Sequence, residues 1–274
     1  MRDRVLLCCL LFFPAMAGAE GRYAEVAGLR IYYEIHGKPS ASLPPLLLLH
    51  GGTETIETSF AKVLPVFAQQ REVIAIEQQG HGHTADLDRP LSYEAMADDT
   101  AAVLKQVGFA QVDCFGWSDG GKVGLMFAMR HPELLRRLAV SGSNFRQDGL
   151  SPAAVKWLRE NPPSKWPPEA QQAYERVAPD PGHWNAFAQK WLDFYLGAPD
   201  WSTEQLKSIR APVLIMVGDR DGVTLEHAQA MRQAISGSRL AVLPGTGHAT
   251  LLQRPEWVLA LLNEFYAAPM PNSQ

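Results

Sequence analysis

Short apolar runs alternate with longer amphipathic segments along most of the chain. This alternation is typical of an α/β protein with a mostly parallel sheet flanked by helices. The expected strands cover residues 29–35, 46–49, 72–76, 112–115, 138–140, 213–217 and 240–243. Helical spacing predicts helices over residues 93–107, 120–129 and 255–266. Because the runs at 46–49, 213–217 and 240–243 are almost unbroken, we expect these three strands to be buried on both faces.

The stretch from residue 146 to residue 205 interrupts this alternation. It holds eight of the 20 prolines and five of the seven tryptophans, namely Trp157, Trp166, Trp184, Trp191 and Trp201. A disordered surface insertion would be poor in aromatic residues rather than rich in them. We therefore expect an ordered helical cap, inserted between the two parts of one core at residues 20–145 and 206–274.

The first 19 residues have the pattern of a secretory signal peptide. A short charged start is followed by an apolar run at residues 5–13 and by Ala17-Gly18-Ala19, a small-x-small cleavage pattern. The alternative is an uncleaved membrane anchor, but the run is shorter than the roughly 20 residues that span a bilayer. We expect cleavage before Glu20, a periplasmic or secreted protein, and no stable membrane insertion of the mature chain.

Composition and charge exclude several classes of protein. The chain has 274 residues, of which 46% are hydrophobic and 20% charged, as in ordinary globular proteins. The formal net charge of −4 becomes −5 when the two arginines and one aspartate of residues 1–19 are removed, so nucleic acid is not an expected partner. After cleavage only Cys114 remains, and a single cysteine cannot form an internal disulfide.

Gly116-Trp117-Ser118-Asp119-Gly120 follows one expected strand and precedes an expected helix. A Gly-x-Ser-x-Gly string alone is weak evidence, but the order strand, turn and helix is that of a nucleophile elbow. In such a turn the serine backbone is strained and its hydroxyl is exposed, while the helix amino terminus favours developing negative charge. The pattern predicts Ser118 as a nucleophile.

A serine hydroxyl needs a base to remove its proton, and that base needs a carboxylate to orient it. His248 lies in a glycine-containing turn directly after the expected strand at 240–243, where this fold would place the base. Two aspartates follow the strand at 213–217. Asp221 lies further into the loop and can reach His248, whereas Asp219 is better suited to the turn itself.

Acyl transfer also requires donors for the tetrahedral oxyanion, usually backbone N–H groups. We expect the amides of Gly52 and Asp119 to serve, because His50-Gly51-Gly52 follows the strand at 46–49. His50 itself is interpreted as a residue that hydrogen-bonds this loop. Two interpretations of the Asp119 carboxylate remain open: stabilisation in the first turn of a helix, or attraction of a cationic group on a substrate.

The His-Gly-Gly turn, Gly-x-Ser-x-Gly, Gly-x-x-Asp and Gly-x-Gly-His occur in the order typical of the α/β-hydrolase superfamily, which the whole mature chain resembles. Residues 116–121 and 237–240 resemble its valacyclovir hydrolase (biphenyl hydrolase-like) branch of serine esterases. This resemblance implies a cofactor-free enzyme with a triad of Ser118, Asp221 and His248. Related families usually carry Asp-x-Arg-Gly-x-Gly-x-Ser where residues 77–84 read Glu-Gln-Gln-Gly-His-Gly-His-Thr, so their substrate preference is not carried over.

His81 and His83 are two residues apart and could suggest a metal site. No acidic or cysteine partner is evident nearby in the sequence, so no metal is expected.

These residues predict an enzyme that hydrolyses small-molecule carboxylic esters. The tryptophan-rich cap favours hydrophobic or aromatic esters, with Trp117, Trp157, Trp184 and Trp191 as candidate substrate contacts. Lactonase, peptidase, carbon-carbon hydrolase and cofactor-free haloperoxidase activities use the same triad and remain alternatives. A ligand-binding protein that keeps the triad but turns over slowly is a further alternative.

Overall fold

The computed structural model describes residues 21–198 and 200–270, and the predicted signal peptide lies outside them. One eight-stranded sheet has the order β1-β2-β4-β3-β5-β6-β7-β8. β1 and β2 run antiparallel, β2 runs antiparallel to β4, and all other neighbours are parallel. The strands are β1 (Arg22–Val26), β2 (Leu29–His36), β3 (Leu46–Leu49), β4 (Val73–Ile76), β5 (Val112–Trp117), β6 (Leu135–Ser141), β7 (Val213–Gly218) and β8 (Arg239–Leu243). The predicted α/β fold class is confirmed.

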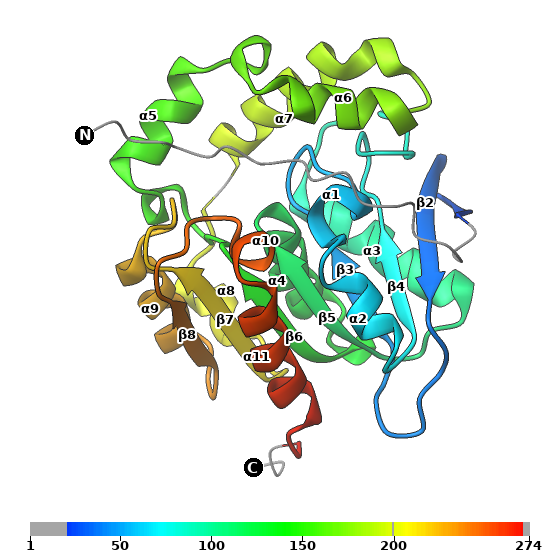
Figure 1. Ribbon diagram of the computed structural model, residues 1–274, viewed down its shortest axis with the longest axis vertical. Coiled ribbons are helices and arrows are strands. Elements are labelled where there is room, and N and C mark those ends of the chain that lie inside the picture. Colours follow the sequence, from blue (N-terminus) through cyan, green and yellow to red (C-terminus); the bar gives the residue numbers. More distant parts are fainter. Residues whose placement is uncertain (1–20, 199, 271–274) are drawn as a thin grey trace.

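Helices cover both faces of this sheet and enclose two separate cores (Figure 1). Successive residues of β3 point to opposite faces, so Leu47 and Leu49 join one core while Leu46 and Leu48 join the other. The first core includes side chains of α3 (Tyr93–Val107), α4 (Asp119–Arg130), α8 (Thr203–Lys207) and α9 (Leu225–Ala234). The second includes side chains of α1 (Ile56–Phe60), α2 (Leu64–Ala68), α10 (Thr250–Gln253) and α11 (Pro255–Ala267).

The expectation that residues 240–243 form a strand buried on both faces is wrong. β8 is the last strand in the sheet order, and Val242 is 44% exposed. β3 and β7 lie inside the sheet and are buried throughout, as predicted. An apolar run therefore located all three strands, but the run itself does not distinguish an edge strand from a central one.

β1 was not predicted, although its sequence carries a signal. It forms a hairpin with β2 through the two-residue turn Ala27-Gly28, whose φ angles are 49° and 82°. Two successive residues with positive φ match the right-handed twist of a hairpin. The burial of β1 alternates, with Ala24 and Val26 buried between exposed neighbours.

The β6–β7 segment, residues 142–212, contains α5 (Pro152–Glu160), α6 (Pro168–Val177) and α7 (Trp184–Gly197) before α8 returns to the sheet. The predicted cap at 146–205 falls within this segment. Figure 1 shows α5, α6 and α7 grouped beyond one end of the sheet. They differ in packing, because α5 has no fully buried residue whereas α7 buries six of its fourteen. No helix within residues 21–198 and 200–270 is both long and apolar enough to cross a membrane.

Candidate active site

Ser118 lies between the end of β5 and the start of α4 with φ 55° and ψ −118°, a conformation that non-glycine residues rarely adopt. The flanking glycines make this sharp turn possible. A Cβ on Gly116 would overlap the backbone of Gly120, and a Cβ on Gly120 would overlap the carbonyl groups of Leu49 and His50. The elbow therefore lies directly against the end of β3.

Ser118, His248 and Asp221 form one hydrogen-bonded chain. His248 Nε2 lies 2.8 Å from Ser118 Oγ, and His248 Nδ1 lies 2.9 Å from Asp221 Oδ1. The same Asp221 oxygen accepts the backbone N–H of Val223 at 3.1 Å. The three residues follow β5, β7 and β8, which are parallel strands whose carboxyl ends share one edge of the sheet. This arrangement suits removal of a proton from the serine.

Burial and the charge of Asp221 act in opposite directions on the protonation of His248. The Asp221 side chain is fully buried, whereas the His248 side chain is 25% exposed. Burial alone would lower the pKa of His248, but the Asp221 carboxylate outweighs it and raises this pKa above the ordinary histidine value. Burial acts to raise the pKa of Asp221. The charge and hydrogen bond of His248, together with hydrogen bonds from backbone N–H groups, outweigh burial and lower this pKa overall.

Asp219, the competing acid in the sequence, does not face His248. Its side chain is 38% exposed and lies 3.9 Å from the guanidinium of Arg220. Its backbone N–H donates to Leu243 O at 3.2 Å, across the loops that follow β7 and β8. Asp219 therefore belongs to the turn.

Two further residues support the histidine and were not predicted in this role. Gly142, with φ 63°, follows β6, and a Cβ there would lie 3.0 Å from His248 Nδ1 and 3.1 Å from Asp221 Oδ2. The glycine directly after a strand was the available signal. Trp117 is buried and donates its indole N–H to the backbone carbonyl of His248 at 3.1 Å. Its polar edge therefore supports the histidine loop, although the sequence suggested a substrate contact.

The predicted oxyanion donors lie in segments that touch, because a Cβ on Gly120, beside Asp119, would overlap the carbonyl group of His50. Within the described part of the chain, the N–H groups of Gly52 and Asp119 donate to no other group. The Gly52 loop is held by His50, whose Nε2 accepts the N–H of Gln78 at 3.0 Å and whose Nδ1 must therefore donate to Gly51 O at 2.8 Å. Burial lowers the pKa of His50 to about 4, so this imidazole is neutral. Two free N–H groups beside an activated serine can bind an oxyanion.

The carboxylate of Asp119 is engaged within the protein. It is buried in the first turn of α4 and accepts hydrogen bonds from Tyr93 Oη at 2.5 Å and Trp191 Nε1 at 2.7 Å. The first of the two sequence interpretations gave this place on the helix, and neither foresaw the two donors. Both carboxylate oxygens are therefore hydrogen-bonded to side chains of this protein.

The other candidate tryptophans differ in exposure. Trp184 is only 2% exposed and packs against Tyr174 and Trp166 in the core. Trp157 is partly exposed and stacks on Trp166 with ring centroids 6.5 Å apart. Trp191 is 8% exposed and lies against Gly52. Trp157 is thus the candidate substrate contact with the most accessible ring.

His81 and His83 do not converge. His83 Nδ1 lies 2.9 Å from Glu77 Oε2, an acidic partner that was not predicted. His81 is buried against His50 and Phe187 instead.

Glu77 also accepts the N–H groups of Ile56 and His83, so its carboxylate connects the loop at 77–84 to α1. Among residues 21–198 and 200–270, no group of three or more His, Cys, Asp or Glu side chains could hold a metal ion.

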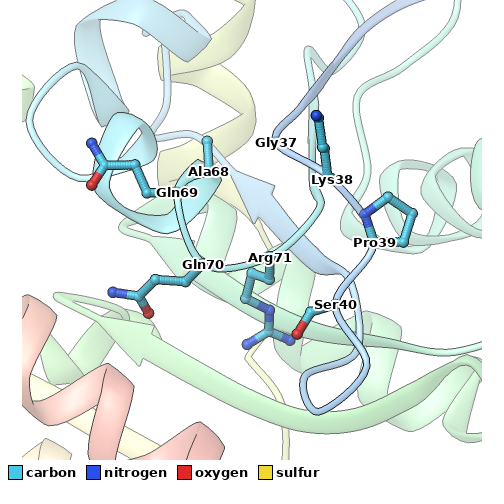
Figure 2. Close-up of a pocket in the computed structure, with 8 residues that line it drawn as sticks. All are labelled: Gly37, Lys38, Pro39, Ser40, Ala68, Gln69, Gln70 and Arg71. Atoms are coloured by element: carbon cyan, nitrogen blue, oxygen red, sulfur yellow. The ribbon is translucent and has the colours of Figure 1, made fainter.

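A hollow of about 470 Å³ lies away from the triad, near the start of β4, and is lined by residues 37–40 and 68–71 (Figure 2). Figure 2 shows Lys38 and Arg71 pointing in different directions, so their charges do not converge. Arg71 instead donates to the buried carboxylate of Asp113 at 2.5 Å. The hollow contains no triad residue and is not the candidate active site.

Comparison with known proteins gives the same picture. The model of a family described as "Alpha/beta hydrolase family" matches residues 46–261. The human protein named Serine hydrolase BPHL is 28% identical over 86% of this chain and 83% of its own length. The 2-hydroxy-6-oxo-2,4-heptadienoate hydrolase of Pseudomonas putida is 29% identical over 82% of this chain and 89% of its own.

Among solved structures, that of a bacterial membrane phospholipase A superposes with a TM-score of 0.78 at 22% identity, covering 91% of this chain and 86% of the other. At this identity the superposition supports the fold alone. The resemblance to the biphenyl hydrolase-like branch, predicted from the sequence motifs, is confirmed by the similarity to the human protein.

Proposed function

The chain belongs to the alpha/beta hydrolase family, and from that premise we propose that it is a serine hydrolase that cleaves carboxylic esters of small hydrophobic or aromatic compounds. The observation that carries the proposal is the hydrogen-bonded chain Ser118–His248–Asp221, with distances of 2.8 Å and 2.9 Å. These are the distances at which a histidine can take and return a proton.

In the proposed acylation step, Ser118 Oγ attacks the ester carbonyl carbon and its proton passes to His248 Nε2. The carbonyl electrons move onto oxygen, and the N–H groups of Gly52 and Asp119 bind the resulting oxyanion. When the tetrahedral intermediate collapses, the carbon-oxygen bond to the alcohol breaks and His248 protonates the departing oxygen. Asp221 stabilises the imidazolium while the proton is on the histidine.

In the proposed deacylation step, His248 removes a proton from water, which attacks the acyl group on Ser118. The second tetrahedral intermediate uses the same two N–H groups, and its collapse returns the proton to Ser118 Oγ. These two steps release an alcohol and a carboxylic acid, and the protein returns to its starting state. Every proton passes through His248 Nε2, the ring nitrogen that faces the serine.

The preference for hydrophobic or aromatic groups is supported by the position of α5. This helix begins beside the loop of the catalytic acid, because Ser151 N–H donates to Gly222 O at 2.8 Å. The stacked pair Trp157 and Trp166 is partly exposed in the same segment. Large rigid rings near a pocket suit an apolar acyl or aryl group.

Carbon-carbon hydrolysis is the second candidate, favoured by the 29% identity to the Pseudomonas putida enzyme. The dienoate named for that enzyme carries a carboxylate, whereas the cation beside the elbow, Lys122, is buried against the rings of Tyr93 and Tyr195. A cation in that position is poorly placed to meet a substrate carboxylate. Ester cleavage is therefore the preferred candidate.

The proposal is tested by mixing the protein with p-nitrophenyl acetate under stopped flow. We expect a burst of one p-nitrophenol per protein, or steady turnover if deacylation is the faster step. Mass spectrometry after treatment with a p-nitrophenyl phosphonate should locate the adduct on Ser118. Turnover of a 2-hydroxy-6-oxo-dienoate without turnover of any ester would favour the second candidate, and a burst without turnover would indicate a slow binding protein.

A further inference from the structure

α7 carries three aromatic side chains, Phe187, Trp191 and Tyr195, at intervals of four residues, so they share one face of the helix. Phe187 packs against His81, with ring centroids 4.8 Å apart. Tyr195 donates its hydroxyl to Asn144 Oδ1 at 3.2 Å. This face of α7 therefore contacts the loops that follow β4 and β6, and Trp191 lies between these two contacts.

Trp191 touches both residues that supply the oxyanion N–H groups. Its indole lies so close to Gly52 that a Cβ at this glycine would overlap the ring. Its indole N–H donates to Asp119 Oδ2 at 2.7 Å, and the side chain is only 8% exposed. One side chain thus contacts the loop of Gly52 and the first turn of α4, which are far apart in the sequence.

The Asp119 carboxylate is held from two sides. Tyr93, on α3, donates to Oδ1 at 2.5 Å, opposite the hydrogen bond from Trp191. A side chain fixed at both oxygens restricts the Cα that bears it and therefore the direction of the adjoining N–H. A displacement of about 1 Å in such a group can cost about a hundredfold in rate.

The same contacts counter an electrostatic problem. A carboxylate on the residue that follows the nucleophile would oppose the negative charge of the oxyanion. Two hydrogen bonds hold this carboxylate. A cation also lies nearby, because Lys122 is one turn along α4 from Ser118, with Nζ 4.6 Å from the centre of the Tyr93 ring and 4.8 Å from that of Tyr195. Burial lowers the pKa of Lys122 to about 8, so it remains largely a cation at neutral pH.

We propose that Trp191 is a positioning residue for the reaction, which packs against Gly52 and hydrogen-bonds Asp119 and thereby keeps both N–H groups directed at the oxyanion. This inference rests on the proposed ester hydrolysis. Trp191 acts through Gly52 and Asp119 and needs no contact with the substrate. Its effect should therefore appear in the rate of the chemical step for even the smallest ester.

The test compares Trp191→Phe with Trp201→Phe. The first keeps an aromatic ring and removes the N–H that binds Asp119. The second is a matched control, because Trp201 is also buried, at 2% exposed, and its ring centroid lies 5.5 Å from that of Tyr93. Its indole N–H has no hydrogen-bond partner in the described part of the chain. With p-nitrophenyl acetate we expect kcat of Trp191→Phe to fall about tenfold with KM little changed. The control should keep both constants within about twofold.

A second readout separates the oxyanion hole from general packing. Ser118 Oγ adds to an aryl trifluoromethyl ketone, its proton passes to His248, and the carbonyl oxygen becomes a bound oxyanion. Affinity for this ketone should fall by about the same tenfold factor as kcat in Trp191→Phe. Affinity for the matching methyl ketone, which binds without forming the oxyanion, should not change.

A double-mutant cycle shows whether Trp191 acts through Asp119. Asp119→Asn alone should lower kcat, and the variant that combines it with Trp191→Phe should be no slower than the slower single variant. Should Trp191→Phe fail to fold, Tyr93→Phe removes the opposite hydrogen bond and is expected to lower kcat and ketone affinity together.

The outcomes distinguish this inference from the function on which it rests. If Trp191→Phe matched Trp201→Phe in kcat and ketone affinity, the inference would be overturned while ester hydrolysis stood. Additive losses in the double variant would also overturn it. A wild-type protein that forms no acyl-enzyme with any ester would overturn the proposed function, and this inference with it.

Discussion

The loops that carry the triad and the helix α7 that faces them are held by different kinds of interaction. In the loops, bonds between backbone groups are prominent: Ser118 N–H donates to Ser141 O at 2.8 Å, and Arg220 N–H donates to Thr246 O at 3.0 Å. The side chain of Trp117 adds a hydrogen bond to the carbonyl of His248. α7 is held mainly by side chains such as Trp191 and Tyr195. The reactive groups therefore depend on backbone hydrogen bonds and on the absence of a Cβ at their glycines, whereas α7 depends on side chains that can be changed singly.

The largest expected effect lies in the loops. Ser118→Ala and His248→Ala each remove a group used in every cycle, so turnover should fall by about 10⁴ to 10⁶. Both variants should remain folded, because neither side chain carries the backbone hydrogen bonds of its loop. Initial rates with p-nitrophenyl esters and thermal melts followed by circular dichroism provide the measurement. Near wild-type turnover in either variant would show that the triad is wrongly assigned.

Asp221→Asn should cost slightly less, about 10⁴ in kcat, because an amide favours the wrong tautomer of the histidine. Asp219→Asn is the matched control in the same loop and should change kcat only a few-fold, since its side chain is exposed and lies 3.9 Å from Arg220 rather than facing His248. The two rate constants are compared at one pH on one ester. The reverse ranking would move the catalytic acid to Asp219.

The pH dependence should show how the loops tune the base. His248 must be neutral to accept the Ser118 proton, so kcat/KM should fall about tenfold per pH unit as the pH drops below the pKa of His248. Asp221 raises that pKa, which places the acidic limb above the ordinary histidine value. Removing the carboxylate in Asp221→Asn should move the limb of the residual activity to lower pH. An unchanged limb would mean that another group titrates.

The smallest effects are expected in the β6–β7 segment. Trp157→Ala and Trp166→Ala should change the ratio of kcat/KM for hexanoate or benzoate over acetate esters by about tenfold or less, because both rings are partly exposed. Trp184→Ala should instead lower the melting temperature and slow all esters alike, since it leaves a cavity. If every folded variant kept the wild-type ratios, the loop at residues 78–84 would be the next candidate for specificity.

The same contrast explains what the sequence could predict. The elbow and its histidine were predictable because their signals are local: glycines at fixed spacing and a turn directly after an apolar run. The hydrogen bonds that Asp119 accepts from Tyr93 and Trp191 join residues 26 and 72 positions apart. They depend on how α3 and α7 approach the elbow, and no local pattern encodes that approach. The exposure of β8 was missed for a related reason, because sheet order is a tertiary property.

At Ser118 the residue that would stabilise the fold most differs from the residue that the reaction needs. Its φ of 55° and ψ of −118° are unfavourable for a residue that carries a Cβ atom, whereas glycine adopts positive φ at little cost. A glycine at this position would fit the fold more comfortably and could not react. Selection for folding alone would thus favour losing the nucleophile, and the serine persists only while its chemistry is useful to the organism.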